Sequence, residues 1–132
     1  MAKMETFLRG LLLILGAASV VISLGHIALG PEVIPGSVPG NATMDNQDRF
    51  FAALFLCYGG AVLWCLKDWR SKLREIRVLA AILFVGGLAR LVSIAIVGLP
   101  HPFYVTMMIV EFVLPVSIVW ASAKIMRSER SD

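Results

Sequence analysis

Few side chains in this 132-residue sequence could do chemistry, and the most unusual one is an arginine inside an apolar run. Arg90 lies in the stretch GGLARLVSI, and Glu111 is the acidic residue of the last apolar stretch. If both stretches cross a membrane, a charge at the helix centre costs ~2.5 to 3.5 kcal/mol on insertion scales, so such charges usually face the protein interior in pairs. The residue types therefore predict a direct or water-bridged ion pair between Arg90 and Glu111.

The spacing of the two charges about a turn supports this pairing. Arg90 comes ten residues before Pro100, and Glu111 comes eleven residues after it. On two helices that rise ~1.5 Å per residue, both side chains would lie ~15 Å from the turn. The alternative is that Arg90 reaches toward Asp45 or Asp48 at the outer mouth of the bundle.

Three further polar residues can join the pair. His26 lies near the end of the first apolar run, Arg49 begins the second, and Ser93 is expected on the same helix face as Arg90. That face would be formed by residues at spacings of four, three and four, namely Gly86, Arg90, Ser93 and Val97. We therefore expect one polar patch that opens toward the outside, with these ligand-binding candidates: Arg90, Glu111, His26, Arg49 and Ser93.

The residues leave the use of this patch open. It could bind a small molecule or a lipid, it could handle protons or ions, or the ion pair could only select one packing of the helices. In an enzyme acting on a lipophilic substrate, Glu111 would be the general acid or base and Arg90 would hold an anionic oxygen. An arginine stabilises the charged form of a neighbouring carboxylate, which favours a charge-holding role and weighs against an enzyme. We therefore predict no catalytic residue.

No cofactor or metal is predicted. A metal site made of His26, Glu111 and an aspartate of the outer loop is imaginable, but no HxxxH or ExxH spacing supports it. We expect the partners to be the lipid bilayer and a lipophilic small molecule or a membrane protein, and not nucleic acid.

The elements that must position these residues are four apolar stretches of about 20 residues, the length that crosses a bilayer. Only 16% of the residues are charged, against about 25% in soluble domains. The sequence therefore predicts an all-α fold, an integral membrane four-helix bundle that forms a single domain. The spans are expected at about residues 7–29, 49–66, 76–99 and 103–123.

The basic residues indicate how such a chain would cross the membrane. With four spans, ten of the twelve Lys and Arg residues fall on one side. The opposite side holds Arg49 together with Glu32, Asp45 and Asp48, so by the positive-inside rule both termini should be cytoplasmic. The alternative of a first run removed as a signal peptide stays open. The ten residues are Lys3, Arg9, Lys67, Arg70, Lys72, Arg74, Arg77, Lys124, Arg127 and Arg130.

Several motifs together resemble a bacterial family of small four-helix membrane proteins, the domain of unknown function family 4345. They are NQDRFFAALFLCYGGAVLW, GGLARLVSIAIVGLPHP and EFVLP, and the resemblance covers nearly the whole chain. The characteristic positions of that family would here be Arg49, Arg90, Ser93, Gly98, Pro100 and Glu111.

That family is similar to the wider DoxD/DoxX-like group, and it has no assigned activity. Some DoxX-like relatives are linked to quinone-coupled redox reactions, and distant four-helix relatives bind or isomerise sterols. The resemblance thus implies a multi-pass protein of a bacterial inner membrane. Our leading expectation is a lipid- or ligand-binding protein or accessory subunit, and the alternative is a membrane enzyme of quinone-linked redox or isomerisation chemistry.

Overall fold

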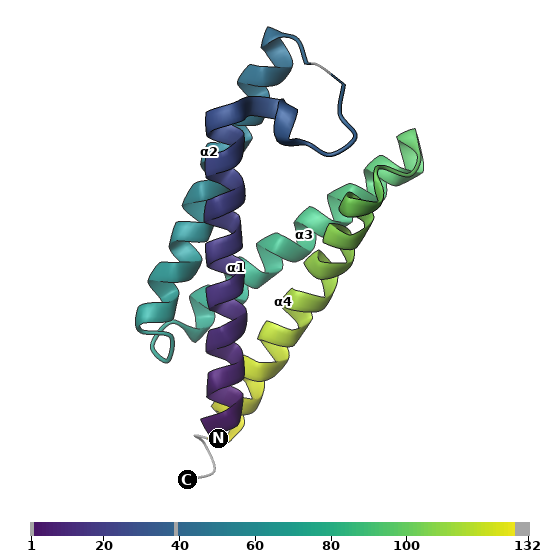
Figure 1. Cartoon of the computed structure of the whole chain (residues 1–132). Helices are drawn as coiled ribbons and strands as arrows, with labels where there is room; N and C mark the ends of the chain where they lie inside the picture. Colours follow the sequence, from purple (N-terminus) through teal and green to yellow (C-terminus); the bar gives the residue numbers. More distant parts are fainter. Residues whose placement is uncertain (1, 39, 129–132) are drawn as a thin grey trace.

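The computed structural model describes residues 2–38 and 40–128, which form four long helices and one short 3-10 helix (Figure 1). The elements are α1 (Ala2–Leu29), η1 (Gly30–Val33), α2 (Ala42–Lys67), α3 (Leu73–Val97) and α4 (Pro102–Ser128). These residues contain no strand, so the predicted all-α class with four helices is confirmed. Arg130, counted above among the basic residues, lies outside the described residues.

All four long helices are long and apolar enough to cross a membrane. Each begins before the corresponding apolar run, because a helix needs backbone hydrogen bonds and a cap more than it needs apolar side chains. The clearest case is α2, whose first residue is Ala42 although its apolar run starts near Phe50. The side chain of Asn41 accepts a hydrogen bond from the backbone N–H of Met44 at 3.0 Å and caps this helix.

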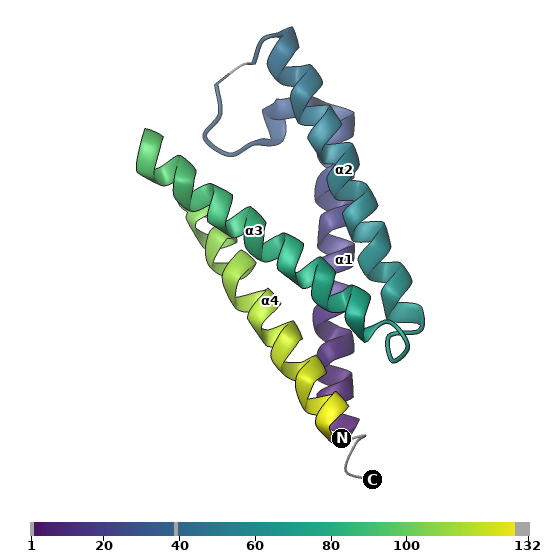
Figure 2. The ribbon, with the colours of Figure 1, turned by 180° about the vertical axis from the view of Figure 1, so that it is seen from behind.

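The helices form two antiparallel pairs that meet at one end of the molecule and diverge at the other (Figures 1 and 2). One pair is α1 with α2, and the other is α3 with α4. The closed end holds the start of α1, the end of α4 and the connection between α2 and α3. The open end holds the connection of residues 30–41 and the turn of residues 98–101.

The hydrophobic core fills the closed half and draws on all four helices. Its most buried members include Leu8, Val62, Ile76 and Ile118. On α3 and α4 the buried residues recur at spacings of three and four, which marks the helix face that packs inward. The two buried stripes are Leu73, Ile76, Ala80, Leu83 and Gly87 on α3, and Pro115, Ile118, Ser122 and Ile125 on α4.

Small residues bring α1 and α2 close together. A Cβ atom added to Gly59 would lie 2.8 Å from the Cβ of Ser19 and 3.0 Å from the backbone oxygen of Gly16. Real Cβ atoms essentially never come so near, so this crossing requires a glycine.

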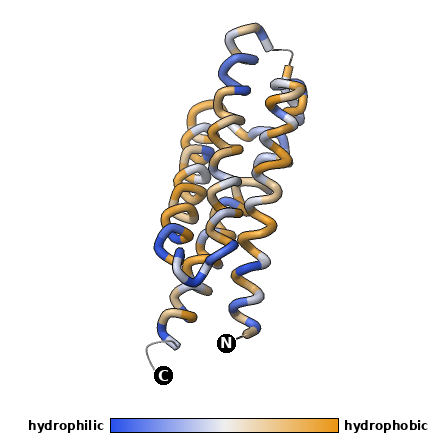
Figure 3. The backbone as a smooth tube through the Cα atoms, turned by 90° about the vertical axis from the view of Figure 1, so that its left-hand side faces the viewer, coloured by the Kyte–Doolittle hydropathy of each residue, from blue (hydrophilic) through white to orange (hydrophobic). Residues whose placement is uncertain are grey.

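Apolar residues dominate the long middle part of the molecule, and hydrophilic residues gather mainly toward its two ends (Figure 3). Many large apolar side chains are exposed on the outside of the helices, among them Ile14, Val85 and Val116. An exterior of this kind suits a hydrocarbon surrounding better than water.

Candidate functional site

Arg90 and Glu111 form a direct ion pair between α3 and α4. The Nε of Arg90 donates to Oε2 of Glu111 at 2.6 Å, and its Nη2 donates to Oε1 at 2.8 Å. The Cζ atom of Arg90 also lies 5.4 Å from the centre of the Tyr104 ring. The expected direct pair is therefore observed, and the alternative in which Arg90 reaches Asp45 or Asp48 is wrong.

The positions of the two charges follow from the packing of the core. Arg90 is the next position of the α3 stripe, three residues after Gly87, and Glu111 is the next position of the α4 stripe, four residues before Pro115. The pair thus lies where the apolar core ends and the helix pairs diverge.

A second pair joins α1 to α2. The Nδ1 of His26 lies 3.0 Å from both carboxylate oxygens of Asp48, and the two side chains are 20% and 17% exposed. Sequence reasoning included His26 but treated Asp48 only as a possible partner of Arg90. The missed signal is the antiparallel geometry of α1 and α2, which brings the end of the first apolar run beside the start of the second.

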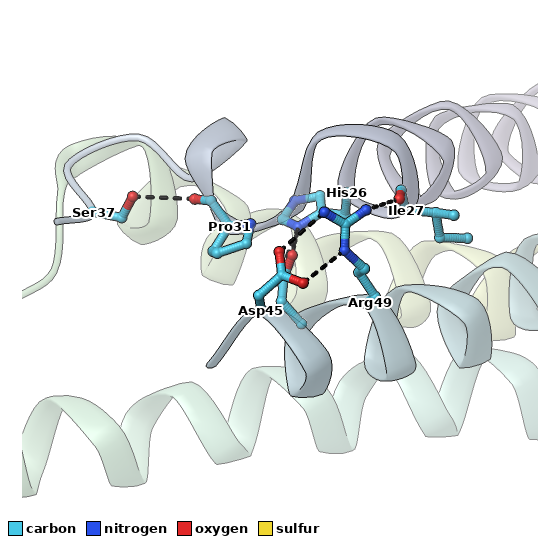
Figure 4. Close-up of polar contacts among 7 residues, drawn as sticks. His26, Ile27, Pro31, Ser37, Asp45 and Arg49 are labelled. Atoms are coloured by element: carbon cyan, nitrogen blue, oxygen red, sulfur yellow. Dashed lines mark hydrogen bonds and ion pairs between the residues drawn. The ribbon is translucent and has the colours of Figure 1, made fainter. Parts of the chain in front are cut away.

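Arg49 has a different role from the expected one. Its guanidinium donates to both carboxylate oxygens of Asp45, one helical turn earlier, at 2.9 and 3.0 Å, and to the backbone oxygen of Ile27 (Figure 4). Arg49 therefore ties the start of α2 to the end of α1. It does not line the cavity described below, which corrects the expected polar patch.

Ser93 does not line the cavity either, and it is exposed. The inward face of α3 runs through Gly87 and Arg90, whereas a Cβ atom added to Gly86 would contact nothing within 4 Å. Of the expected face, Arg90 is therefore on the inward side of α3, whereas Gly86 and Ser93 are not. Two adjacent glycines fit a three-four spacing equally well, so the sequence does not show which of them packs.

A cavity of about 590 Å³ lies between the two helix pairs in the open half. It is lined by all four helices and by residues 33–35 of the connection after α1, and we name it the wedge cavity. Apolar side chains dominate its wall, including the aromatic rings of Phe51, Phe55 and Phe103. The polar residues of the wall are Ser23, His26, Asp48, Arg90, Tyr104 and Glu111.

Ser23 stands out in this wall because its hydroxyl is buried without a partner. The residue is 1% exposed, and its Oγ atom makes no hydrogen bond within the described part of the chain. Ser19, one turn earlier, instead donates to the backbone oxygen of Leu15 at 2.8 Å. A buried polar group without a partner costs about 1 to 3 kcal/mol, so a bound molecule with a hydrogen-bonding group can recover this energy at Ser23.

The acidic and basic side chains of the wedge cavity are paired with one another. Arg90 faces Glu111, and His26 faces Asp48, so each potential cation has its own carboxylate. Both hydrogen bonds of Arg90 to Glu111 use Nε and Nη2, which leaves the Nη1 group unengaged by that carboxylate. Since Arg90 already has a carboxylate partner, the wall suits an uncharged polar group better than an anion.

Metal ligands are not gathered here. Within residues 2–38 and 40–128, no three His, Cys, Asp or Glu side chains lie close enough together to hold a metal ion.

The fold and the cavity define a class: an all-α protein of four helices long and apolar enough to span a membrane, with polar groups inside an apolar cavity between two helix pairs. Residues 7–122 match the family described as Domain of unknown function (DUF4345), so the chain belongs to that family. The family expected from the sequence motifs is therefore confirmed. Searches of the curated proteins and of the solved structures found no match.

Proposed function

We propose that this chain is an integral protein of a bacterial inner membrane that binds a lipophilic small molecule in the wedge cavity, either alone or as an accessory subunit. Support for the membrane comes from four apolar helices and an apolar exterior. The Lys and Arg residues gather at the closed end, so both termini are cytoplasmic in this proposal. A relation to the DoxD/DoxX-like group is part of the proposal and rests on the sequence motifs.

The orientation can be tested with single cysteines at opposite ends. Val38→Cys lies in the connection at the open end and Ser71→Cys in the connection at the closed end, both at exposed positions, in a chain whose Cys57 and Cys65 are replaced by alanine. In intact spheroplasts a membrane-impermeant maleimide is expected to label Val38→Cys only, and Ser71→Cys after permeabilisation. The reverse pattern would overturn the orientation, and equal labelling of both would overturn the membrane span.

The observation that carries the ligand proposal is the unpartnered hydroxyl of Ser23 inside a cavity of about 590 Å³. Pockets of this size hold molecules of drug size, with apolar walls for the body and a few polar groups that fix its orientation. In this proposal the polar head is held by Ser23, His26 and Arg90, which all line the cavity. The ligand class that fits is an uncharged amphiphile, with a hydroxyl or carbonyl group on an apolar body.

The experiment compares two neighbouring alanines on α2. Ala52 is buried and lines the wedge cavity, whereas Ala53 is exposed and does not. Protein extracted from its native membrane is analysed by native mass spectrometry, followed by identification of small molecules in an organic extract. We expect the unmodified chain and Ala53→Phe to retain a defined lipophilic molecule, and Ala52→Phe to lose it. An empty unmodified chain, or equal retention by both variants, contradicts the proposal.

A second candidate function, a membrane enzyme acting on a lipophilic substrate, is favoured by the contact between His26 and Asp48. A carboxylate that holds one imidazole nitrogen fixes the ring and leaves the other nitrogen to take a proton, as a general base requires. His26 suits this role better than Glu111, because both oxygens of Glu111 accept from Arg90. The test is turnover of the co-purifying molecule: under the enzyme proposal, His26→Gln retains the molecule but no longer converts it.

A further inference from the structure

A second hollow lies on the α3 and α4 pair and shares no lining residue with the wedge cavity. Its volume is about 500 Å³, and we name it the α3/α4 groove. It is lined by small side chains such as Ala81 and Ala123 and by larger ones such as Val85, Pro115 and Trp120. All the lining residues are apolar except for the indole N–H of Trp120, so the groove suits a hydrocarbon chain.

Cationic side chains lie where this groove approaches the closed end. On α4, the Nζ of Lys124 lies 5.3 Å from the centre of the Trp120 ring. On α3, the Nε of Arg77 donates to the hydroxyl of Ser122 at 2.9 Å, which holds the guanidinium beside α4. At about 100° of rotation per residue, Arg77 and Arg74 lie within ~60° of the groove face of α3, while the acidic Glu75 lies ~150° away.

Within the described part of the chain, two further acidic residues of this end contact other groups. Glu5 pairs with Arg70 at 2.6 Å, and a carboxylate oxygen of Asp68 accepts from the hydroxyl of Ser71. Among the described residues, Lys124, Arg77 and Arg74 thus place cationic groups at the end of an apolar channel.

We propose that the α3/α4 groove binds one anionic phospholipid, with an acyl chain in the groove and the headgroup phosphate at Lys124, Arg77 and Arg74. The charge complementarity selects this occupant: an acyl chain alone does not need the cations, and an apolar partner helix would leave them without a counter-charge. Trp120 lies beside Lys124, as expected for an indole at the level of the headgroups. The site is independent of the wedge ligand, but it rests on the proposed orientation, which places the closed end at the leaflet rich in anionic lipid.

The test uses the full chain in detergent micelles and native mass spectrometry during titration with phosphatidylglycerol or with phosphatidylcholine of the same acyl chains. We expect phosphatidylglycerol to bind more tightly than phosphatidylcholine. Its affinity should fall about fivefold for each cation removed, because each basic residue near an anionic lipid raises the affinity by about this factor. The charge variant is Lys124→Gln with Arg74→Gln. Its control, Arg9→Gln, removes an exposed cation of α1 that lies outside the groove, and should leave the preference unchanged.

The variant Ala81→Phe fills the groove and should weaken the binding of both lipids. Ala89 on the same helix is exposed and lines neither hollow, so Ala89→Phe should leave the binding of both lipids unchanged. Equal affinity for the two lipids, or an equal loss with Arg9→Gln, would overturn the proposal. So would Ala81→Phe changing the oligomeric state while leaving lipid binding intact, because the groove would then be a protein interface.

Failure of this proposal is distinguishable from failure of the proposed function. Ala52→Phe fills the wedge cavity and should leave the preference for phosphatidylglycerol intact. A reversed orientation is detected by the labelling of Val38→Cys and Ser71→Cys, without reference to any lipid.

Discussion

Arg90 and Glu111 take facing positions in two stripes that otherwise bury apolar or small residues along α3 and α4. The pair is therefore held by the same interdigitation that packs the core below it. The side chain of Glu111 is 16% exposed and that of Arg90 is 37% exposed, so both partners, which line the wedge cavity, are partly shielded from solvent.

This arrangement predicts unequal effects of single and double substitutions. Arg90→Leu leaves a buried carboxylate without its counter-charge, and Glu111→Leu does the same to the guanidinium. Breaking a buried pair costs about 3 to 5 kcal/mol, and the partial exposure of Arg90 reduces the expected loss to about 1 to 3 kcal/mol. The double variant Arg90→Leu with Glu111→Leu should regain much of this stability.

The measurement is thermal unfolding in one detergent, combined with the ligand assay. A double variant that is stable and still retains the co-purifying molecule would make the pair purely structural. A double variant that is stable but empty would assign the pair to binding.

The adjacent glycines provide a prediction with internal controls. Gly59→Ala should lower the unfolding temperature, because the new Cβ meets Ser19 and the backbone of Gly16, whereas Gly60→Ala meets nothing within 4 Å and should be neutral or slightly stabilising. The cost at Gly59 should be about 1 to 3 kcal/mol, as is usual for overpacking. Equal effects of the two substitutions, measured by thermal unfolding, would contradict the close approach of α1 and α2.

Ser23 and Ser19 predict different roles for two serines on one helix. Ser23→Ala removes an unpartnered hydroxyl from the wedge cavity, so the protein should be as stable as before, or slightly more stable, and bind its ligand more weakly by about 0.5 to 1.5 kcal/mol. Ser19→Ala removes a hydroxyl that already donates to Leu15 and should not change binding. Titration calorimetry with the identified ligand checks both, and loss of binding in Ser19→Ala alone would reverse the assignment.

Arg49 is predicted to act on stability rather than on the ligand. Arg49→Gln removes the ion pair to Asp45 and the contact to the end of α1. Because both charged side chains are 40% exposed, the loss of stability should be small, since solvent screens exposed ion pairs. Ligand affinity should change less than it does for Ser23→Ala, and a larger loss of affinity would return Arg49 to the binding site.

The partner of Arg90 was predictable, because only one acidic residue lies at a matching distance beyond the turn. The position of Ser93 outside the cavity was not predictable. It depends on the register of α3, that is, on which of Gly86 and Gly87 packs against Phe112, and this is a detail of side-chain packing.

Arg49 lies outside the wedge cavity for a different reason. Apolar runs mark where a span begins, whereas α2 starts a full two turns earlier and thereby brings Asp45 within reach of Arg49. The divergence of the two helix pairs could not be predicted from the sequence pattern either, because it depends on how the four helices pack around one core. The cavity between them therefore appeared only in the structure.

Each helix pair of the open half carries its own counter-charges. Arg90 is neutralised by Glu111 within α3 and α4, and Arg49 by Asp45 within α1 and α2, where His26 also meets Asp48. Each arginine of the open half thus finds its carboxylate within its own hairpin. Docking of the two hairpins is therefore not required to neutralise either guanidinium, and each hairpin could carry its arginine into an apolar surrounding already paired.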